Sequence, residues 1–416
     1  MSDPVLIIGA GVAGMTAAVE LADSGVNVVL VEKESSVGGN ALDLYKAFPT
    51  DDCFYCFESN RWRTGIRKCF YRSALLDQPN IDLKISSTVK EITRKSGEFL
   101  VKISSEPKYV DNKKCIMCGL CMEKSKAFYL TSPQCQPQAV VFDPSKLDDG
   151  AKEAEEECPT GAINLASEET REEIQVSDIV FASGYHEMKP VNVDEYGYGT
   201  HPNIITQLEL AQVMDPLGED KGQLLRPSDK APAKNVMMVQ CVGSRDENYY
   251  PYCSKICCVY ALKHAIIAKT ERDANRVSVV YIDIRTYDRH ERYYSDAREA
   301  GVEFIRGRIT QVEPLDEDTL NVIVYDSLLD KYLKFTVDLF VLSSALEPSE
   351  DPHNILKSLE LGLSSGFLAP HESTPENKVR VGESIYACGT ALGPAEIPES
   401  VTQARAVASL ILQGRK

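Results

Sequence analysis

The stretch from residue 5 to residue 33, VLIIGAGVAGMTAAVELADSGVNVVLVEK, decides the fold of this chain. A short apolar run leads into a glycine-rich turn, a segment with helical periodicity and a second apolar run that ends at Glu32. This order predicts a βαβ unit that binds a dinucleotide. Gly9 permits the tight turn, Gly11 lets a pyrophosphate approach the helix N-terminus, and Gly14 permits close packing of the helix.

The residues that follow this unit favour FAD as its dinucleotide. Glu32 falls where a carboxylate can hold ribose hydroxyls, and it disfavours a 2′-phosphate. Gly38 and Gly39 then form a pair that, in flavoproteins with two dinucleotide domains, follows the ribose-binding acid. A simple turn at these two glycines is the alternative interpretation.

The segment 376–413 is similar to the motif that closes the FAD site in the same class of flavoprotein. It predicts a strand, a turn at Gly389 and a helix whose N-terminus faces the flavin. Thr390 stands where that motif usually has an acid. The segment 177–190, SDIVFASGYHEMKP, predicts the strand and turn by which the chain returns to the FAD domain.

The composition limits the classes of function. A length of 416 residues allows two or three domains. The formal charge of -17 argues against binding of nucleic acid or anionic lipid and indicates either solubility or a basic protein partner. No apolar run reaches the roughly eighteen residues of a membrane helix, and a strand begins almost at once. We therefore expect a cytoplasmic chain without signal peptide or membrane span, in which thirteen cysteines indicate metal or redox chemistry.

The stretch CIMCGLC, residues 115–121, has the cysteine spacing of a bacterial ferredoxin loop, but the usual fourth cysteine is missing. The segment EECPTGAINL, residues 156–165, supplies a cysteine followed by proline, as in the second motif of two-cluster ferredoxins. Zinc is the alternative metal, and Cys135 is a rival fourth ligand that lacks the proline. We predict one 4Fe-4S cluster on four cysteines: Cys115, Cys118, Cys121 and Cys158.

Residues 234–284 repeat the strand, turn, helix and strand of a dinucleotide domain. The turn holds a single glycine and a tyrosine-rich insertion with cysteines, instead of a glycine-rich phosphate loop. Without successive glycines the backbone cannot approach a pyrophosphate, so we expect no hydride delivery from NAD(P)H here. Structural thiols at a helix start are the alternative to a metal site. We predict a second 4Fe-4S cluster on the cysteines of this turn: Cys241, Cys253, Cys257 and Cys258.

Residues 51–72 contain further cysteines and a concentration of basic residues. A redox-active dithiol among Cys53, Cys56 and Cys69 would make the protein a disulfide reductase, but burial near the flavin is favoured because no group that lowers a thiol pKa is evident. The basic residues form either a docking face, a contact to FAD phosphates or an ordinary solvated face: Arg61, Arg63, Arg67, Lys68 and Arg72.

The stretch CVGSRD, followed by YCS and CC, closely resembles the HdrA family, the iron-sulfur flavoproteins of heterodisulfide reductase. The resemblance implies an oxidoreductase component in which FAD exchanges paired and single electrons with two 4Fe-4S clusters. It implies a cluster on the cysteines of residues 241–258. No Ser-His-Asp arrangement or carboxylate pair stands out in the sequence, so we expect no catalytic residue. The similarity extends along most of the chain, through FPTDDC, QPNIDL, EPKYVDNKKC, SGYHEMKP and GPAEIPESVTQA.

Within this family the compact length is most similar to the HdrA-like flavoprotein of the quinone-interacting membrane-bound oxidoreductase (Qmo) complex. That resemblance implies two partner subunits: a second flavoprotein of the same family and a membrane subunit that binds haem or quinone. It implies that electrons pass between the menaquinone pool and adenylylsulfate reductase in sulfate reduction. The chain would then associate with the membrane through its partner subunits. Another complex of the family, such as heterodisulfide reductase or an electron-bifurcating one, is the alternative. An NAD(P)H-dependent disulfide reductase and an assembly subunit with structural zinc are rivals from other classes.

The fold class that these patterns predict is an α/β flavoprotein with two dinucleotide-binding domains, similar to thioredoxin reductase, and an inserted ferredoxin-like domain. We expect five segments along the chain: the first part of the FAD domain at 1–108, the iron-sulfur insert at 109–170, connecting strands that return to the FAD domain at 171–232, the degenerate NAD(P)-type domain at 233–345 and the closing part of the FAD domain at 346–416.

Overall fold

The computed structural model describes residues 3–48, 75, 78–95, 97–131, 138–349, 353–371 and 378–415. A six-stranded sheet lies at the centre of the first dinucleotide domain, with the order β21-β22-β9-β1-β2-β3. The two apolar runs of the first βαβ unit pair in parallel as β1 and β2, and α1 connects them. The bounds are β1 Val5–Ile8, α1 Val12–Asp23, β2 Val28–Val31, β3 Ile81–Lys84, β9 Asp178–Phe181, β21 Arg380–Gly382 and β22 Ile385–Ala387.

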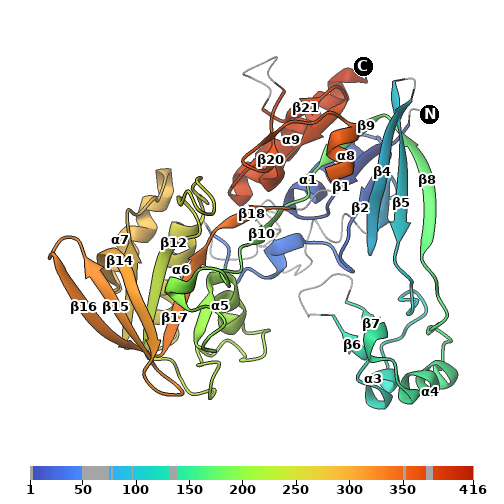
Figure 1. Cartoon of the computed structure of the whole chain (residues 1–416). Helices are drawn as coiled ribbons and strands as arrows, with labels where there is room; N and C mark the ends of the chain where they lie inside the picture. Colours follow the sequence, from blue (N-terminus) through green and yellow to red (C-terminus); the bar gives the residue numbers. More distant parts are fainter. Residues whose placement is uncertain are drawn as a thin grey trace, which may run out of the picture.

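The segment at 177–190 returns to this sheet, because β9 pairs in parallel with β1. The closing helix α9, Ile397–Gly414, packs against α1, so the two ends of the chain form one domain (Figure 1). A three-stranded antiparallel sheet covers the other face, where Leu6 and Val29 share a buried cluster with Ile92 and Phe99. Its strands are β4 Ser87–Lys95, β5 Glu98–Ser105 and β8 Thr170–Val176, with α8, His353–Ser358, beside β4.

The ferredoxin-like insert lies between β5 and β8 and forms a small unit of its own below the FAD domain (Figure 1). Phe128 and Phe142 pack with Tyr109 in its core. Among its described residues are a two-stranded sheet and two α-helices: α3 Leu120–Lys124, β6 Phe128–Leu130, β7 Val140–Phe142 and α4 Asp149–Glu157.

The second dinucleotide domain is built on a seven-stranded sheet with the order β11-β17-β12-β13-β14-β15-β16. The first five strands of that order are parallel, and β15 and β16 are antiparallel. The predicted strand, helix and strand of residues 234–284 are present as β12, α6 and β13. The bounds are β12 Asn235–Val242, α6 Cys257–Thr270, β13 Arg276–Tyr281, α7 Glu291–Glu299, β14 Glu303–Pro314, β15 Leu320–Asp326, β16 Lys331–Val337 and β17 Leu339–Ser344.

The second sheet includes a strand from the segment that we expected to return to the FAD domain, so its expected start at residue 233 is too late. β11, Ile204–Thr206, pairs in parallel with β17, and its two isoleucines are buried there. Thr206 and Glu209 then form a capping box that begins α5, Gln207–Met214. This short strand was missed because three residues carry too little periodicity to be recognised.

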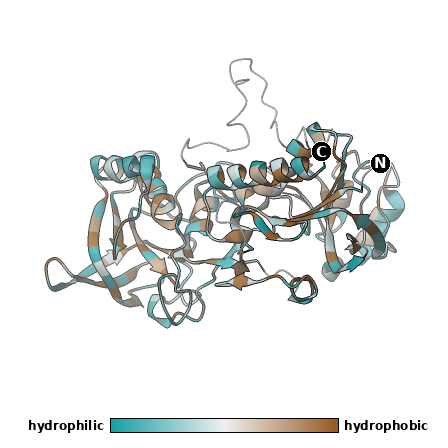
Figure 2. Ribbon diagram, turned by 90° about the horizontal axis from the view of Figure 1, so that it is seen from above, coloured by the Kyte–Doolittle hydropathy of each residue, from teal (hydrophilic) through white to brown (hydrophobic). Residues whose placement is uncertain are grey.

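Two short antiparallel strands connect the two dinucleotide domains: β10, Tyr185–Glu187, and β18, Leu346–Pro348 (Figure 1). A small hairpin, β19 Leu363–Ser364 and β20 Phe367–Leu368, lies near the closing helix. Hydrophobic residues lie along the strands, and hydrophilic residues colour the outward turns of the helices (Figure 2). Within the residues described, no helix combines the length and apolar character needed to cross a membrane.

Candidate functional site

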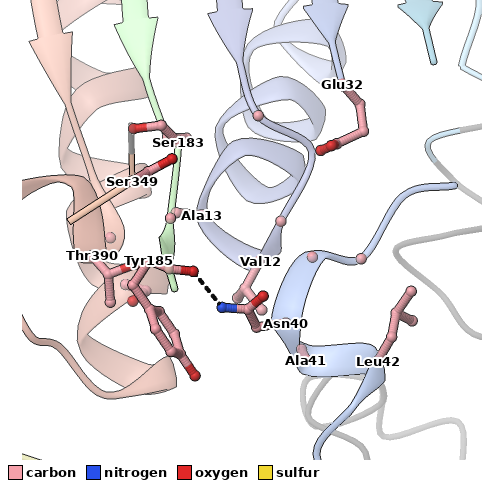
Figure 3. Close-up of a pocket in the computed structure, with 18 of the residues that line it drawn as sticks. Val12, Ala13, Glu32, Asn40, Ala41, Leu42, Ser183, Tyr185, Ser349 and Thr390 are labelled. Atoms are coloured by element: carbon pink, nitrogen blue, oxygen red, sulfur yellow. Dashed lines mark hydrogen bonds between the residues drawn. The ribbon is translucent and has the colours of Figure 1, made fainter. Parts of the chain in front are cut away.

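A cavity of about 670 Å³ lies at the C-terminal ends of β1 and β2, where dinucleotides bind in this type of sheet (Figure 3). Side chains from the connecting strands also line it, among them Ser183 and Tyr185. Gly14 does not line the cavity. The other predicted cofactor-binding residues all do: Gly9, Gly11, Glu32, Gly38, Gly39, Gly389 and Thr390.

The glycines of the first turn have different physical roles. Gly9 has a φ of +101°, and a Cβ there would lie 2.4 Å from the backbone oxygen of Ala182. A Cβ at Gly14 would lie 1.8 Å from the backbone oxygen of Gly9, so this glycine lets α1 pack against the turn. At Gly11 the nearest atom, Gly39 Cα, is 3.9 Å away. Because no side chain caps α1, its first N–H groups can bind a pyrophosphate.

Glu32 lies at the cavity wall with its carboxylate held in place. Its Oε2 accepts a hydrogen bond from the N–H of Ala10 at 2.6 Å, and its Oε1 accepts one from the N–H of Glu34 at 2.9 Å. Burial raises the pKa of Glu32, although both N–H donors act in the opposite direction. The carboxylate is positioned to accept ribose hydroxyls when a dinucleotide is bound.

The turn before α9 forms another part of the cavity wall. Gly389, with a φ of +67°, donates its N–H to Gln403 Oε1 at 2.8 Å. A Cβ there would lie 2.9 Å from the Cβ of Ala13, so the turn packs directly against α1. Asn40 Nδ2 donates to the backbone oxygen of Tyr185 at 2.7 Å, which ties the segment after β2 to β10 (Figure 3).

The second domain also contributes to this cavity, which the sequence did not predict. Ile256 from the turn before α6, and Tyr260 and Lys263 from α6 itself, line it. Lys263 is only 2% exposed, its Nζ donates to the backbone oxygen of Tyr45, and it lies 4.6 Å from the ring centroid of Tyr260. A lysine directly after six apolar residues at the start of this helix was the available signal. The helix that begins with two cysteines therefore borders the predicted flavin site.

The four cysteines of the insert line one small hollow, together with apolar residues that include Val110 and Ile163. The N–H of Met117 donates to Cys115 Sγ at 3.4 Å, and the N–H of Ala162 donates to Cys158 Sγ at 3.3 Å. Met117 has a positive φ of 52°, which turns its N–H toward the sulfur of the cysteine two residues earlier. Such N–H donors compensate negative charge on cluster thiolates.

The structure also brings together the four cysteines of the second domain. Cys257 interacts with Cys258 through a side-chain hydrogen bond and electrostatically with Cys241 and Cys253. The N–H of Lys255 donates to Cys253 Sγ at 3.4 Å, and Lys255 has a φ of +65°. This local geometry is the same as that of Met117 and its cysteine in the ferredoxin loop.

The surroundings raise the pKa of two of these thiols, for different reasons. It raises the pKa of Cys241 to about 11, while the hydrogen bond to Cys258, followed by burial, raises the pKa of Cys257. The same hydrogen bond lowers the pKa of Cys258. Because thiolates are the metal-binding form, cluster binding here must displace protons.

The donor sets fit iron-sulfur clusters. In the part of the chain that the structure describes, no three His, Cys, Asp or Glu side chains are arranged to hold a single metal ion. In a 4Fe-4S cluster each of four thiolates binds a different iron, so the sulfurs surround the cluster and need not converge on one point. Each place supplies four cysteines, and N–H groups donate to their sulfurs at both.

The turn of the second domain offers no open phosphate loop. Its single glycine, Gly243, has a φ of +71°, and a Cβ there would lie 2.2 Å from Met188 Sδ. The α-carbon therefore faces a packed side chain instead of a space for a pyrophosphate. Several predicted features lie outside the described residues: Cys53, Cys56, Cys69, Cys135, Arg61, Arg63, Arg67, Lys68 and Arg72.

Comparisons with known families identify two of the domains. Residues 7–51 match the model of the NAD(P)-binding Rossmann-like domain. Residues 110–165 match the model of the 4Fe-4S single cluster domain of Ferredoxin I. A dinucleotide-binding domain and a 4Fe-4S ferredoxin domain are thus present in one chain.

Several curated relatives that are HdrA proteins or similar to them match almost the whole chain. The HdrA protein of the H(2):CoB-CoM heterodisulfide,ferredoxin reductase of Methanothermobacter marburgensis is 35% identical over 98% of this chain and 63% of its own length. HdrA of the CoB--CoM heterodisulfide reductase of Methanocaldococcus jannaschii is 36% identical, with the same coverage. The HdrA-like protein of Archaeoglobus profundus is 31% identical over 98% of this chain and 66% of its length. The chain thus spans just under two thirds of the length of these relatives.

Solved structures share the fold at low sequence identity. Thioredoxin reductase of T. acidophilum superposes with a TM-score of 0.55 at 13% identity, covering 100% of this chain and 99% of its own. The NAD-dependent persulfide reductase of A. fulgidus gives a TM-score of 0.52 at 16% identity, covering 99% of this chain and 60% of its own. These neighbours, together with the ferredoxin match, confirm the predicted fold class.

Proposed function

Because this chain is homologous to HdrA proteins of heterodisulfide reductase over 98% of its length, we propose that it is the FAD- and iron-sulfur-containing electron-transfer subunit of a larger oxidoreductase complex. The resemblance to that family, expected from the residues around Cys257, is confirmed by these relatives. When bound, FAD exchanges electrons in pairs or singly, and each 4Fe-4S cluster exchanges one electron. The protein residues have the tasks of binding, spacing and shielding these groups.

One observation carries the proposal: the same cavity is lined by the glycines of the FAD domain and by residues of α6. Cys257 and Cys258 begin that helix, and Ile256, the residue just before them, lines the cavity. A cluster on this quartet would therefore lie beside the flavin. We infer that electrons pass directly between these two cofactors.

The cluster of the insert serves a different task in this proposal. Cys118 is exposed, and Ile116 and Met117 beside it are 63% and 53% exposed. An exposed cluster loop with apolar side chains suits electron exchange with a partner protein, because a partner can exclude water there. We therefore assign the insert to the contact with another redox protein of the complex or with a soluble enzyme.

At a finer level we propose that the chain is the HdrA-like flavoprotein of a quinone-interacting membrane-bound oxidoreductase. It would relay electrons between a menaquinone-linked membrane subunit with haem or a quinone site and adenylylsulfate reductase, beside a second flavoprotein of the family. The sequence resemblance supports this choice, and the charge of -17 suits a basic docking partner. The chain would then lie in the cytoplasm and reach the membrane through its partners.

A different complex of the family, one that performs heterodisulfide reduction or electron bifurcation, is the second candidate, and the names of the relatives favour it. Anaerobic purification from the native host, with mass spectrometry of the copurified subunits, distinguishes the two. Adenylylsulfate reductase and a membrane protein that binds quinone are expected for the first. Subunits homologous to those of heterodisulfide reductase would contradict it and support the second.

The cofactor content tests the proposal at the coarser level. Anaerobically purified protein is expected to contain one FAD and about eight irons, since each cluster has four. Zinc in place of iron would overturn it in favour of an assembly role. Little bleaching of the flavin by NADH is expected, because the packing of Gly243 against Met188 leaves no phosphate loop. Rapid bleaching by NADH, with turnover lost in Cys53→Ser, would support a disulfide reductase instead.

A further inference from the structure

Two arginines and an aspartate lie beside the second cysteine quartet, just after the C-terminal ends of β12 and β13. Arg245 Nη1 is 4.0 Å from Cys241 Sγ, and the backbone of Arg285 hydrogen-bonds the Cys258 thiol. Asp283 pairs with both guanidinium groups: its Oδ1 contacts Arg245, and its Oδ2 lies 3.4 Å from Arg285 Nε. The three side chains together carry one net positive charge.

The backbone around Arg245 is held in place by hydrogen bonds within its loop. Arg245 has a φ of +58°, a conformation that a residue other than glycine adopts only when its surroundings impose it. Its N–H donates to the backbone oxygen of Tyr252 at 2.9 Å, and the N–H of Asp246 donates to that of Tyr250 at 3.1 Å. The loop backbone is therefore fixed, and the ion pair with Asp283 holds the guanidinium beside Cys241.

We propose that the positive charges of Arg245 and Arg285 raise the reduction potential of the cluster that the second quartet would hold. This inference rests on the proposed function, since it requires that cluster to be present. A cluster held by four thiolates is negatively charged, and an added electron increases the negative charge. A fixed positive charge nearby stabilises the reduced form more than the oxidised form, so the potential rises. Asp283 limits the rise, because its charge acts in the opposite direction.

The consequence for the relay is a direction of electron flow. In this transfer one electron moves from the flavin site to the cluster on the second quartet. The flavin is oxidised as the cluster is reduced, so no further oxidant or reductant is needed. A higher cluster potential favours the electron on the second quartet over the flavin site. Removing a guanidinium would therefore return the electron toward the flavin site.

The test is an anaerobic redox titration with dithionite, followed by EPR of the second cluster, on the full protein. In Arg245→Gln and in Arg285→Gln, the midpoint potential is expected to become more negative. At a solution potential equal to the wild-type midpoint, the ratio of reduced to oxidised cluster should fall by about tenfold or more, since a charge roughly 4 Å from a ligand sulfur acts through an effective permittivity of about 20. Asp283→Asn is expected to shift the midpoint in the positive direction.

Arg276 provides the matched control. It begins β13, at the opposite end of the strand from Asp283, and pairs with Glu303 at 2.7 Å. Arg276→Gln removes the same charge from the same domain, so a general change in net charge or stability would affect it equally. Its midpoint potential is expected to equal that of the wild type.

The outcomes separate this inference from the function on which it rests. If the wild type lacks a second paramagnetic centre, the proposed function fails. If every variant keeps its iron and FAD but both arginine variants retain the wild-type midpoint, the inference is overturned and the function stands. Shifts of the same sign in Arg245→Gln and Asp283→Asn would also overturn it. If a glutamine variant loses its cluster, the midpoint potential of Asp283→Asn decides alone. A positive shift supports the inference, and an unchanged midpoint overturns it.

Discussion

His290 Nε2 and Glu396 Oε2 are 2.9 Å apart and join the two dinucleotide domains. His290 directly precedes α7, and Glu396 is the N-cap of α9 and lines the flavin cavity. Both side chains are only about a tenth exposed, at 11% and 12%. A second pair, Lys255 with Glu399, joins the loop of the second quartet to the same helix. The domain that carries the cluster is thus attached directly to the helix beside the flavin.

Replacing His290 by alanine is expected to destabilise the contact between the domains. It leaves the buried carboxylate of Glu396 without one of its partners, which costs about 1–3 kcal/mol of the free energy of unfolding. Thermal unfolding of anaerobic protein should show a lower Tm with unchanged FAD and iron content. Arg292→Ala is the control, because its pair with Asp296 is exposed and worth at most about 1 kcal/mol. Equal effects of the two variants would contradict this prediction.

Glu32→Gln is expected to weaken FAD binding by roughly 10- to 100-fold. Glutamine has one acceptor oxygen where the carboxylate has two, and both oxygens already accept backbone hydrogen bonds. The charged acceptor for the ribose is lost, which costs about 1.5–3 kcal/mol. Titration of the apoprotein with FAD, followed by flavin fluorescence, measures the change. Glu20→Gln, on the outer surface of α1 beside Arg405, should bind FAD as the wild type does.

The two clusters are expected to be lost independently. Cys118→Ala should remove about four irons and the centre of the insert, and Cys257→Ala with Cys258→Ala should remove about four irons and the other centre. Iron analysis and EPR of anaerobic protein measure both losses. Cys388→Ala is the control, because Cys388 is a buried thiol outside either quartet. Persistence of the second signal in the double variant would contradict the assignment of that quartet.

The same iron analysis decides whether Cys158 or Cys135 is the fourth ligand of the insert cluster. The N–H of Ala162 donates to Cys158 Sγ at 3.3 Å, the kind of contact that cluster ligands have. Cys158→Ala is therefore expected to lose about four irons, and Cys135→Ala none. The opposite result would make Cys135 the fourth ligand of the insert cluster.

Glu187 is expected to make the stability of the protein depend on pH. Burial raises its pKa to about 7, and the hydroxyl of Thr206 donates to its Oε2 at 2.6 Å. In the unfolded chain this carboxyl ionises near 4.5, so between about pH 4.5 and 7 the folded state binds more protons. Its effect is therefore a loss of stability as pH rises through that window, amounting to about 3 kcal/mol above pH 7.

Glu187→Gln tests this dependence, because the amide fits the same site without a charge. The N–H of Leu208 donates to Glu187 Oε1 at 3.2 Å, and the glutamine oxygen can accept it equally well. The gain in Tm over the wild type should be absent near pH 4.5 and largest at about pH 8. A gain that does not change with pH would show that charge at this position does not matter.

The residues of short segments were sufficient to predict much of this protein. The glycine turn at Gly9 to Gly14, the alternation of strand and helix in both dinucleotide units and the ferredoxin loop depend on neighbouring residues. Backbone freedom at Gly9 and cysteine spacing are local properties, so they can be recognised without knowledge of the fold. The family resemblance was visible for the same reason.

The tertiary structure decided which of these segments meet. β11 is part of the second sheet because it pairs in parallel with β17, which lies more than a hundred residues later in the chain. Lys263 lines the flavin cavity, and Asp283 pairs with Arg245, through contacts between elements that lie apart in the sequence. Such contacts depend on how the chain returns on itself and on the packing of two domains. No local pattern of residues encodes them, because the same pattern is compatible with many partners.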